Sequence, residues 1–102
     1  MIINATIKDN VLKISLNGEL DEYSANYTRN YLDDAIIGNS YQYVVFDMKG
    51  LDFMDSTGIG VLLGRYKLLK SKQKDIYIAN PKPVVEKIIN MSGIYEIMPR
   101  IS

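Results

Sequence analysis

The first sixteen residues alternate between hydrophobic and polar side chains. Residues 2–7 alternate loosely, and residues 11–16 alternate more strictly after the polar pair Asp9-Asn10. A period of two is typical of strands that bury one face, and Asp or Asn between two such segments favours a tight turn. This pattern predicts a β-hairpin, which the segment 18–21 closes.

Three later segments place apolar side chains at helical spacing. They cover residues 22–37, 58–70 and 83–92, and Pro83 suits the first turn of the third helix. The side chains expected to face the core are Ile59, Leu62, Leu63, Tyr66 and Leu69 in the second helix and Val84, Ile88 and Met91 in the third. Tyrosines recur every four residues in the first helix, at Tyr23, Tyr27 and Tyr31. They could form an aromatic recognition stripe, but we interpret them as flanking the buried face of the helix.

Short apolar segments between these helices predict buried strands. Residues 43–46 form a continuous apolar segment that we expect to end at Asp47, with a loop at 50–53. Further short strands are expected at 75–79 and 94–97. Alternating strands and helices imply right-handed parallel crossovers. We therefore predict an α/β fold in which one mixed sheet, an N-terminal hairpin followed by parallel strands, is covered by helices mainly on one face.

Composition narrows the possible functions. The 102 residues include 12 Lys plus Arg, 12 Asp plus Glu, and no His or Cys, which suits a single domain over residues 1–102. The chain therefore lacks disulfides, a thiolate nucleophile, Cys-based zinc sites and the commonest general base. A zero net charge argues against nucleic-acid binding. The N-terminus has no signal-peptide pattern and no apolar segment reaches membrane-spanning length, so we expect a cytoplasmic protein without membrane contact.

The segment 53–67 is the richest in candidate functional residues. Asp55, Ser56 and Thr57 are all competent helix N-caps that follow a predicted strand. Interior helical glycines cost about 0.8–1 kcal/mol each relative to alanine, so the glycines of this helix call for a compensating role. Gly60 and Gly64 share one face beside Val61, away from the expected inward stripe. We interpret that face as a surface on which a partner backbone docks closely.

Other chemistry for the same segment has little support. The spacing matches neither a dinucleotide-binding G-x-G-x-x-G motif, because Leu63 occupies the third glycine position, nor a Walker A motif. Ser56 has no histidine to activate it as a nucleophile. Asp52 and Asp55 could hold a divalent cation, but loop acids are commonly just solvated. Asp47 is unsuited to a phosphoaspartate receiver because the chain opens with a hairpin. The sequence thus predicts no catalytic residues, cofactor or metal, and no enzyme activity.

Three segments together resemble a known family. Residues 55–67 (DSTGIGVLLGRYK) are similar to the phosphorylation segment of the anti-sigma-factor antagonists, the STAS-domain family, and their ending is closer to its sporulation branch than to its general-stress branch. Gly18-Glu19-Leu20-Asp21 resembles the family's Gly-x-Leu-Asp turn, and Met91-Ser92-Gly93 resembles the close of its third helix. The resemblance covers nearly the whole chain in matching order.

The resemblance implies a partner-switching regulator of transcription. In the family, the unphosphorylated form binds an anti-sigma factor that is also a serine kinase and thereby frees the sigma factor. The kinase phosphorylates the serine that corresponds to Ser56, with Thr57 as a possible minor acceptor, and a PP2C-type phosphatase reverses the reaction. The expected partner-binding residues are Asp21, Asp55, Ser56, Thr57, Gly58, Gly60, Val61 and Gly64.

Two further expectations accompany this interpretation. A STAS domain that senses a small anion or lipid, or serves as a signalling scaffold, is the alternative function. Family members generally carry a C-terminal helix after the last strand, whereas this sequence ends at Pro99-Arg100-Ile101-Ser102, so an exposed apolar surface is expected. The charged residues are unevenly distributed along the chain. Residues 1–55 carry nine acidic and four basic side chains, and residues 56–102 carry three acidic and eight basic ones. Ser56 therefore lies where the local charge changes sign.

Overall fold

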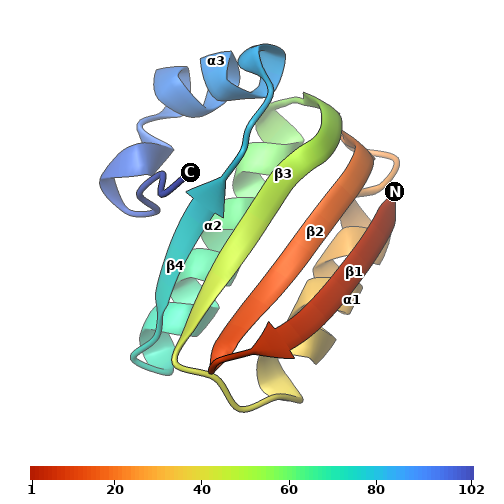
Figure 1. The fold of residues 1–102 in the computed structure, drawn as a ribbon. Coiled ribbons are helices and arrows are strands. Elements are labelled where there is room, and N and C mark those ends of the chain that lie inside the picture. The colour runs from red at the N-terminus through yellow and green to blue at the C-terminus, as the bar shows by residue number, and fades with distance from the viewer.

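The computed structural model describes all 102 residues as one four-stranded sheet with three α-helices. In chain order the elements are β1 (Ile2–Lys8), β2 (Val11–Leu20), α1 (Ala25–Ile37), β3 (Tyr43–Met54), α2 (Ser56–Ser71), β4 (Asp75–Ala79), α3 (Pro83–Ser92) and the short 3₁₀ helix η1 (Ile94–Glu96). The strands lie in the order β1-β2-β3-β4, and Figure 1 shows them side by side.

The predicted hairpin is confirmed. β1 and β2 are antiparallel and joined by Asp9 and Asn10, whose φ angles of 53° and 65° match a two-residue hairpin turn. β2–β3 and β3–β4 are parallel pairs, as crossovers through α1 and α2 require. The fold is therefore the mixed α/β sheet that the sequence predicts.

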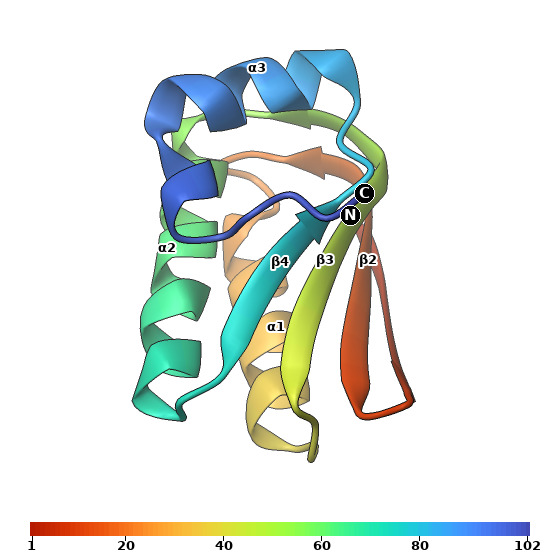
Figure 2. The same cartoon turned by 60° about the vertical axis from the view of Figure 1, so that its left-hand side comes forward.

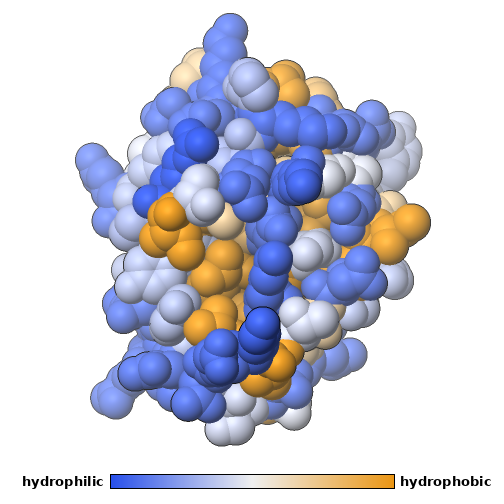
Figure 3. Space-filling model, in the orientation of Figure 1, coloured by the Kyte–Doolittle hydropathy of each residue, from blue (hydrophilic) through white to orange (hydrophobic).

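The helices are unequally distributed around the sheet. Figure 2 shows α1 and α2 together on one face, with α3 crossing the end where β3 finishes. The core lies under α1 and α2 and includes the fully buried side chains Leu12, Ile14, Leu16, Val44, Phe46, Ile76 and Ile78. The opposite face has no helix, and Figure 3 shows polar side chains along it with hydrophobic ones between them. None of the helices is both long and apolar enough to cross a membrane.

The third strand is longer than predicted. It does not end at Asp47, and residues 50–53, expected to form a loop, continue the strand to Met54. Two register irregularities in its pairing with β2, between Ser15 and Asn17 and between Gly18 and Glu19, let the extended pairing continue past Gly50. The polar and glycine residues that suggested a loop therefore mark bulges in a long strand.

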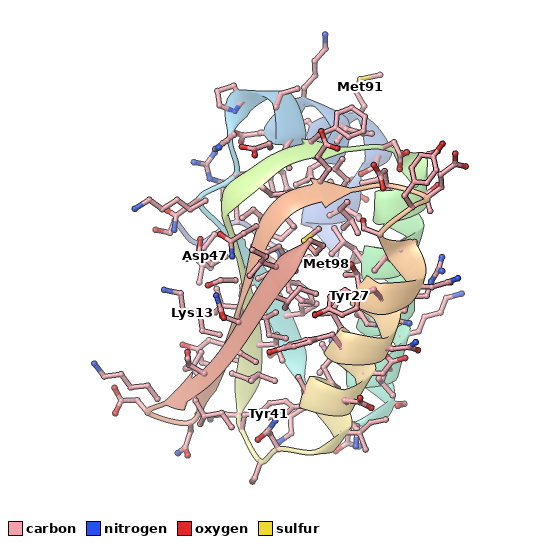
Figure 4. All side chains as sticks on the ribbon, turned by 90° about the vertical axis from the view of Figure 1, so that its right-hand side faces the viewer. Lys13, Tyr27, Tyr41, Asp47, Met91 and Met98 are labelled. Atoms are coloured by element: carbon pink, nitrogen blue, oxygen red, sulfur yellow. The ribbon has the colours of Figure 1, made fainter.

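The C-terminal region differs from the prediction in two ways. Val84 and Met91, expected to face the core, are exposed, whereas Val85 and Ile89 are buried, because only a narrow i, i+4 stripe of α3 meets the end of the sheet. Figure 4 shows Met91 pointing away from the molecule. Where a strand was expected at 94–97, residues 94–96 form η1, because Gly93 adopts a left-handed φ of 77° that turns the chain out of α3.

The helix α2 also turns a different face inward. It begins at Ser56, two residues earlier than predicted, and buries Val61 and Arg65 together with Leu62 and Leu69. Ile59, Leu63 and Tyr66 are only half-buried. The Arg65 guanidinium lies between α2 and α1, where its Nε is 3.0 Å from a carboxylate oxygen of Asp33.

Burial lowers the pKa of Arg65, against the attraction of Asp33, yet an arginine keeps its charge at any physiological pH. Its Nη1 is buried without a hydrogen-bond partner, and the contact with Asp33 does not have hydrogen-bond geometry. Arg65 is therefore part of the packing between two helices. Because a polar residue, Arg65, lies on the inward face of α2, the apolar pattern alone predicts the wrong inward face for this helix.

Candidate functional site

The carboxyl ends of β2 and β3 bring two of the predicted site residues to one end of the molecule. Leu20 and Met54 are register partners at the ends of these parallel strands, and Asp21 and Asp55 follow them directly. The Asp55 N–H donates to the Leu20 carbonyl across a distance of 3.4 Å. The loop before α1 and the first turn of α2 therefore lie side by side.

Asp55 is the N-cap of α2. Its Oδ1 accepts hydrogen bonds from the backbone N–H groups of Thr57, at 2.9 Å, and Gly58, at 3.2 Å. Ser56 is the first residue of the helix and is exposed, and Thr57 is half-buried. The carboxylate of Asp55 thus occupies two of the free N–H groups of the first turn, while the Ser56 side chain beside it is exposed.

Asp21 stabilises the turn before α1 in a similar way. Its Oδ1 accepts from the N–H groups of Tyr23 and Ser24 at 3.0 and 3.1 Å. The Ser24 hydroxyl donates to the Glu19 carbonyl at 2.7 Å and accepts from the Asp21 N–H at 3.1 Å. These bonds fix the loop next to α2 and hold the Asp21 carboxylate at the same end of the sheet as Ser56.

The glycines of α2 have two different environments. A Cβ on Gly58 would lie 2.9 Å from the Leu20 carbonyl oxygen and would also overlap the Met54 side chain, so glycine allows α2 to begin close against the strand ends. A Cβ on Gly60 or Gly64 would meet nothing within 4 Å. Gly58 is therefore a packing residue, and the other two leave an outward strip of α2 without side chains.

Val61 must be removed from the predicted partner-binding set. Its side chain is 0% exposed and belongs to the hydrophobic core. Because the inward face of α2 is rotated relative to the prediction, the Val61 side chain points into the core, whereas a Cβ on Gly60 or Gly64 would point into open space. Gly58 is also buried, so it shapes the site but offers no side chain for contact.

Two exposed aromatic residues beside the site were not singled out from the sequence as partner-binding residues. Tyr23, in the turn that Asp21 stabilises, is 88% exposed, and Phe53, next to the end of β3, is 43% exposed. Phe53 was assigned to a loop, so its position at a strand end could not be recognised. An aromatic residue two positions before the N-cap of a glycine-rich helix is the signal that would have indicated it.

The two carboxylates considered as a cation pair have other partners. Asp52 forms an ion pair with Lys82, which precedes α3, and Asp55 caps α2. The chain contains no cluster of three or more His, Cys, Asp or Glu side chains arranged to hold a metal ion. The Asp52–Lys82 contact instead ties the start of α3 to the end of β3.

A second polar group, the Asp47 cluster, consists of Lys13, Asp47 and Asn80. Figure 4 shows Lys13 and Asp47 together on the open face of the sheet. The Asp47 Oδ1 accepts from the Lys49 N–H at 3.0 Å and from the Asn80 amide at 3.3 Å, and its Oδ2 is 3.4 Å from the Lys13 ammonium. Burial alone would raise the pKa of Asp47, but these hydrogen bonds and the Lys13 charge outweigh it and hold the pKa below its ordinary value.

Comparisons with known proteins agree with this geometry. Residues 3–102 match the model of the STAS domain family. The chain is 40% identical over 89 residues to an anti-sigma F factor antagonist of Paenibacillus polymyxa, covering 87% of this chain and 76% of that protein.

Two solved structures of the anti-sigma factor antagonist SpoIIAA share the fold. The unphosphorylated form matches with a TM-score of 0.82 at 27% identity and covers 99% of this chain and 89% of that one. The phosphorylated form, from Bacillus, matches with a TM-score of 0.73 at 26% identity and covers 99% and 92%. The chain therefore belongs to the STAS domain family.

Proposed function

We propose that this chain is an anti-sigma-factor antagonist that phosphorylation of Ser56 switches off. The unphosphorylated chain binds an anti-sigma factor that is also a serine kinase, and the sigma factor is released. The observation that carries the proposal is the exposed Ser56 in the first turn of α2, directly after a carboxylate that already caps the helix. The curated antagonist relative supports the same role.

The partner surface that we propose surrounds Ser56. Tyr23 and Phe53 provide exposed aromatic side chains, the residue type most often found at the energetic centre of an interface. Gly60 and Gly64 provide a strip of α2 on which a partner backbone can lie close to the helix. This surface combines anchoring side chains with a flat helical strip, which suits a folded protein partner better than a small ligand.

Phosphorylation would change this surface mainly through charge. A phosphoserine adds about −1.5 to −2 charge and three acceptor oxygens. The helix dipole offsets only about 0.3–1 kcal/mol of that charge, and the Asp55 carboxylate already accepts from two first-turn donors, the N–H groups of Thr57 and Gly58. The new charge therefore projects toward the partner, at the end of the sheet that already holds the carboxylates of Asp21 and Asp55.

The size of the required effect is modest. A hundredfold loss of affinity corresponds to about 2.7 kcal/mol. Repulsion and steric exclusion at one exposed residue can supply that amount, and the fold does not need to change. We propose that a PP2C-type phosphatase removes the phosphate, and that the cycle takes place in the cytoplasm, where sigma factors act.

Anion sensing is less well supported. The hollow nearest the site, about 430 Å³ in volume, is lined by Glu19 and Asp21 together with Met1, Tyr23, Ser24 and Tyr27. The two carboxylates outnumber the single cationic group in this lining, the α-amino group of Met1, so its net charge disfavours an anion. The site geometry therefore favours a protein partner over a small anion.

The proposal is tested by incubating the chain with a candidate anti-sigma kinase and ATP and measuring the intact mass. We expect one added phosphoryl group on the wild type and on Thr57→Ala, and none on Ser56→Ala. Thr57→Ala is the matched control because it removes the neighbouring hydroxyl and leaves Ser56 in place. Equal phosphorylation of Ser56→Ala and wild type would assign the modification to another residue.

A further inference from the structure

One edge of the sheet is covered by other residues of the chain, and the other edge is open. The edge of β4 is covered by the C-terminal residues: Ile78 donates to the Pro99 carbonyl at 3.0 Å and accepts from Ile101 at 2.9 Å. The edge formed by β1 has no neighbouring strand, and Figure 1 shows it open along its length. An open edge presents unpaired N–H and C=O groups that can pair with another strand.

The hairpin register determines which groups point outward from β1. Lys8 and Val11 flank the two-residue turn, and such flanking residues exchange hydrogen bonds. Peptide groups alternate in direction along a strand, so those of residues 2, 4, 6 and 8 face β2. In agreement, the Ile2 carbonyl accepts from the Asn17 side chain of β2 at 3.2 Å. The backbone groups of Ile3, Ala5 and Ile7 therefore face the open edge.

The same three residues carry the apolar face of β1. Their register partners are Leu16, Ile14 and Leu12, which are fully buried under the helices. Ile3 is buried in the same layer, but Ile7 is 44% exposed. The open edge thus combines free backbone groups with an apolar residue that its own chain leaves partly uncovered.

We propose that β1 is a dimerisation strand and that its partner is β1 of a second copy of this chain. Antiparallel pairing around a two-fold axis at Ala5 places Ala5 opposite Ala5 and Ile3 opposite Ile7 of the second copy. Each of these pairs joins residues whose backbone groups face outward, so each exchanges two hydrogen bonds. The two four-stranded sheets then form one continuous sheet.

The side chains favour this register over its neighbours. Ile7 of each copy is covered by Ile3 of the other, while Asn4 lies opposite Thr6 on the solvent-exposed face. A shift by two residues in either direction pairs one isoleucine with Ala5 and moves the other beyond the apolar strand, opposite Met1 or Asp9. Self-complementarity at a single register is what a two-fold interface requires.

The arrangement leaves the Ser56 site accessible. α2 packs over β3 and β4, whereas α1 lies between α2 and the β1 edge. Figure 4 shows Tyr27 on the side of α1 near β1, and its ring lies 6.4 Å from that of Tyr31. In the dimer these tyrosines flank the joined strands, on the helix-covered face of the sheet.

The first test measures molar mass by light scattering over a range of protein concentrations. The wild type is expected to approach twice the chain mass of 11.6 kDa as concentration rises. Ala5→Pro and Ile7→Lys should remain at the single-chain mass. Proline at residue 5 removes only an outward N–H, which edge strands tolerate, so circular dichroism and thermal melting should show a folded protein.

Val84→Lys is the matched control for Ile7→Lys, because it places the same charge at an exposed apolar position on α3. It should dimerise like the wild type. A wild type that stays at the single-chain mass at every concentration, or an unchanged dimer in Ala5→Pro, overturns the proposal.

The second test reads the register directly. The chain has no cysteine, so a single introduced thiol forms only an intermolecular disulfide. Residues at the two-fold axis of a hydrogen-bonded pair have Cα atoms about 5.5 Å apart, within disulfide range. Mild oxidation should crosslink Ala5→Cys rapidly, and Asn4→Cys, Thr6→Cys and the remote control Ser71→Cys at a rate at least tenfold lower. Equal rates for Ala5→Cys and Ser71→Cys would contradict the dimer.

Discussion

The Asp47 cluster and the first turn of α2 are each organised around an aspartate, but they leave different groups free. In the Asp47 cluster both carboxylate oxygens have partners: the Lys49 N–H and Asn80 amide on one, and Lys13 on the other. At α2 the Asp55 carboxylate caps the helix, while Ser56 beside it remains exposed. The Asp47 carboxylate is therefore fully used in contacts within the chain, whereas the Ser56 hydroxyl remains available to another protein.

This difference separates a stabilising polar cluster from a site for modification. Where a carboxylate is buried and fully paired, removing it leaves its donors without partners and destabilises the fold. Where an exposed hydroxyl lies next to a completed cap, removing it changes the stability of the fold little but removes the group that a kinase can modify. Substitutions test this comparison. We expect the largest loss of stability at Asp47, smaller losses at Gly58 and Asp55, and a gain at Gly60.

The largest loss of stability is expected for Asp47→Ala. The change strands the Lys49 N–H and the Asn80 amide and removes the partner of Lys13, which costs about 1.5–3 kcal/mol for hydrogen bonds to a charged group. Chemical denaturation at neutral pH measures it. A loss below about 0.5 kcal/mol, the ordinary range for surface substitutions, would show that the cluster is only a solvated surface feature.

Acidification should remove the stabilisation that the Asp47 carboxylate provides. The folded-state pKa of Asp47 lies below that of the unfolded chain, so its stabilisation is complete above the unfolded-state pKa of about 3.9. The stabilisation is then lost as the pH falls through the folded-state pKa. The difference in unfolding free energy between wild type and Asp47→Asn should therefore shrink on acidification below about pH 4. A constant difference would contradict the role of the charge.

Gly58→Ala is expected to destabilise by about 1–3 kcal/mol, as for overpacking at a close contact. The added methyl would lie 2.9 Å from the Leu20 carbonyl oxygen, so the start of α2 must move away from the strand ends. Thermal denaturation measures the change. Wild-type stability in this variant would show that the close approach of α2 to β2 is not needed.

Asp55→Ala is expected to cost about 1 kcal/mol, the usual effect of losing an N-cap. The N–H groups of Thr57 and Gly58 lose their acceptor but lie at a partly exposed helix end, where water can replace it. Asp55→Asn keeps a side-chain acceptor and serves as the control with a smaller loss. Equal losses in the two variants would assign the effect to charge and not to capping.

Gly60→Ala should stabilise the chain by roughly 0.5–1 kcal/mol, because it improves helix propensity and the new methyl meets open space. Under the proposed function it should also weaken binding to the anti-sigma factor. Stability is measured by denaturation and binding by calorimetry. Unchanged binding would place the partner away from this strip of α2.

The sequence predicted most of the fold because its strongest patterns are local. The hairpin follows from Asp9-Asn10 between two alternating segments, and β4 follows from a short apolar segment between helices. The predicted bounds of an element are wrong where pairing between residues distant in sequence determines its length. β3 passes through Asp47 because its backbone continues to pair with β2, a strand distant in sequence, as far as Met54.

The site was also predicted only in part. Asp21, Asp55 and Ser56 come together because β2 and β3 are parallel and end in register, which the order of elements already implied. Val61 was placed on the wrong face because Arg65 is buried, and no periodicity rule expects an inward arginine. Phe53 is not recognisable from the sequence as a site residue, because Asp47 and Gly50 indicate that the strand ends before it.

The most direct test of the account is the affinity of the chain for its anti-sigma kinase before and after phosphorylation of Ser56, measured by calorimetry. The account predicts at least a hundredfold loss of affinity, about 2.7 kcal/mol, with unchanged stability of the phosphorylated chain. Unphosphorylated Ser56→Ala should bind like the wild type, and Ser56→Asp more weakly. Equal affinity of the phosphorylated and unphosphorylated chains would contradict the switch.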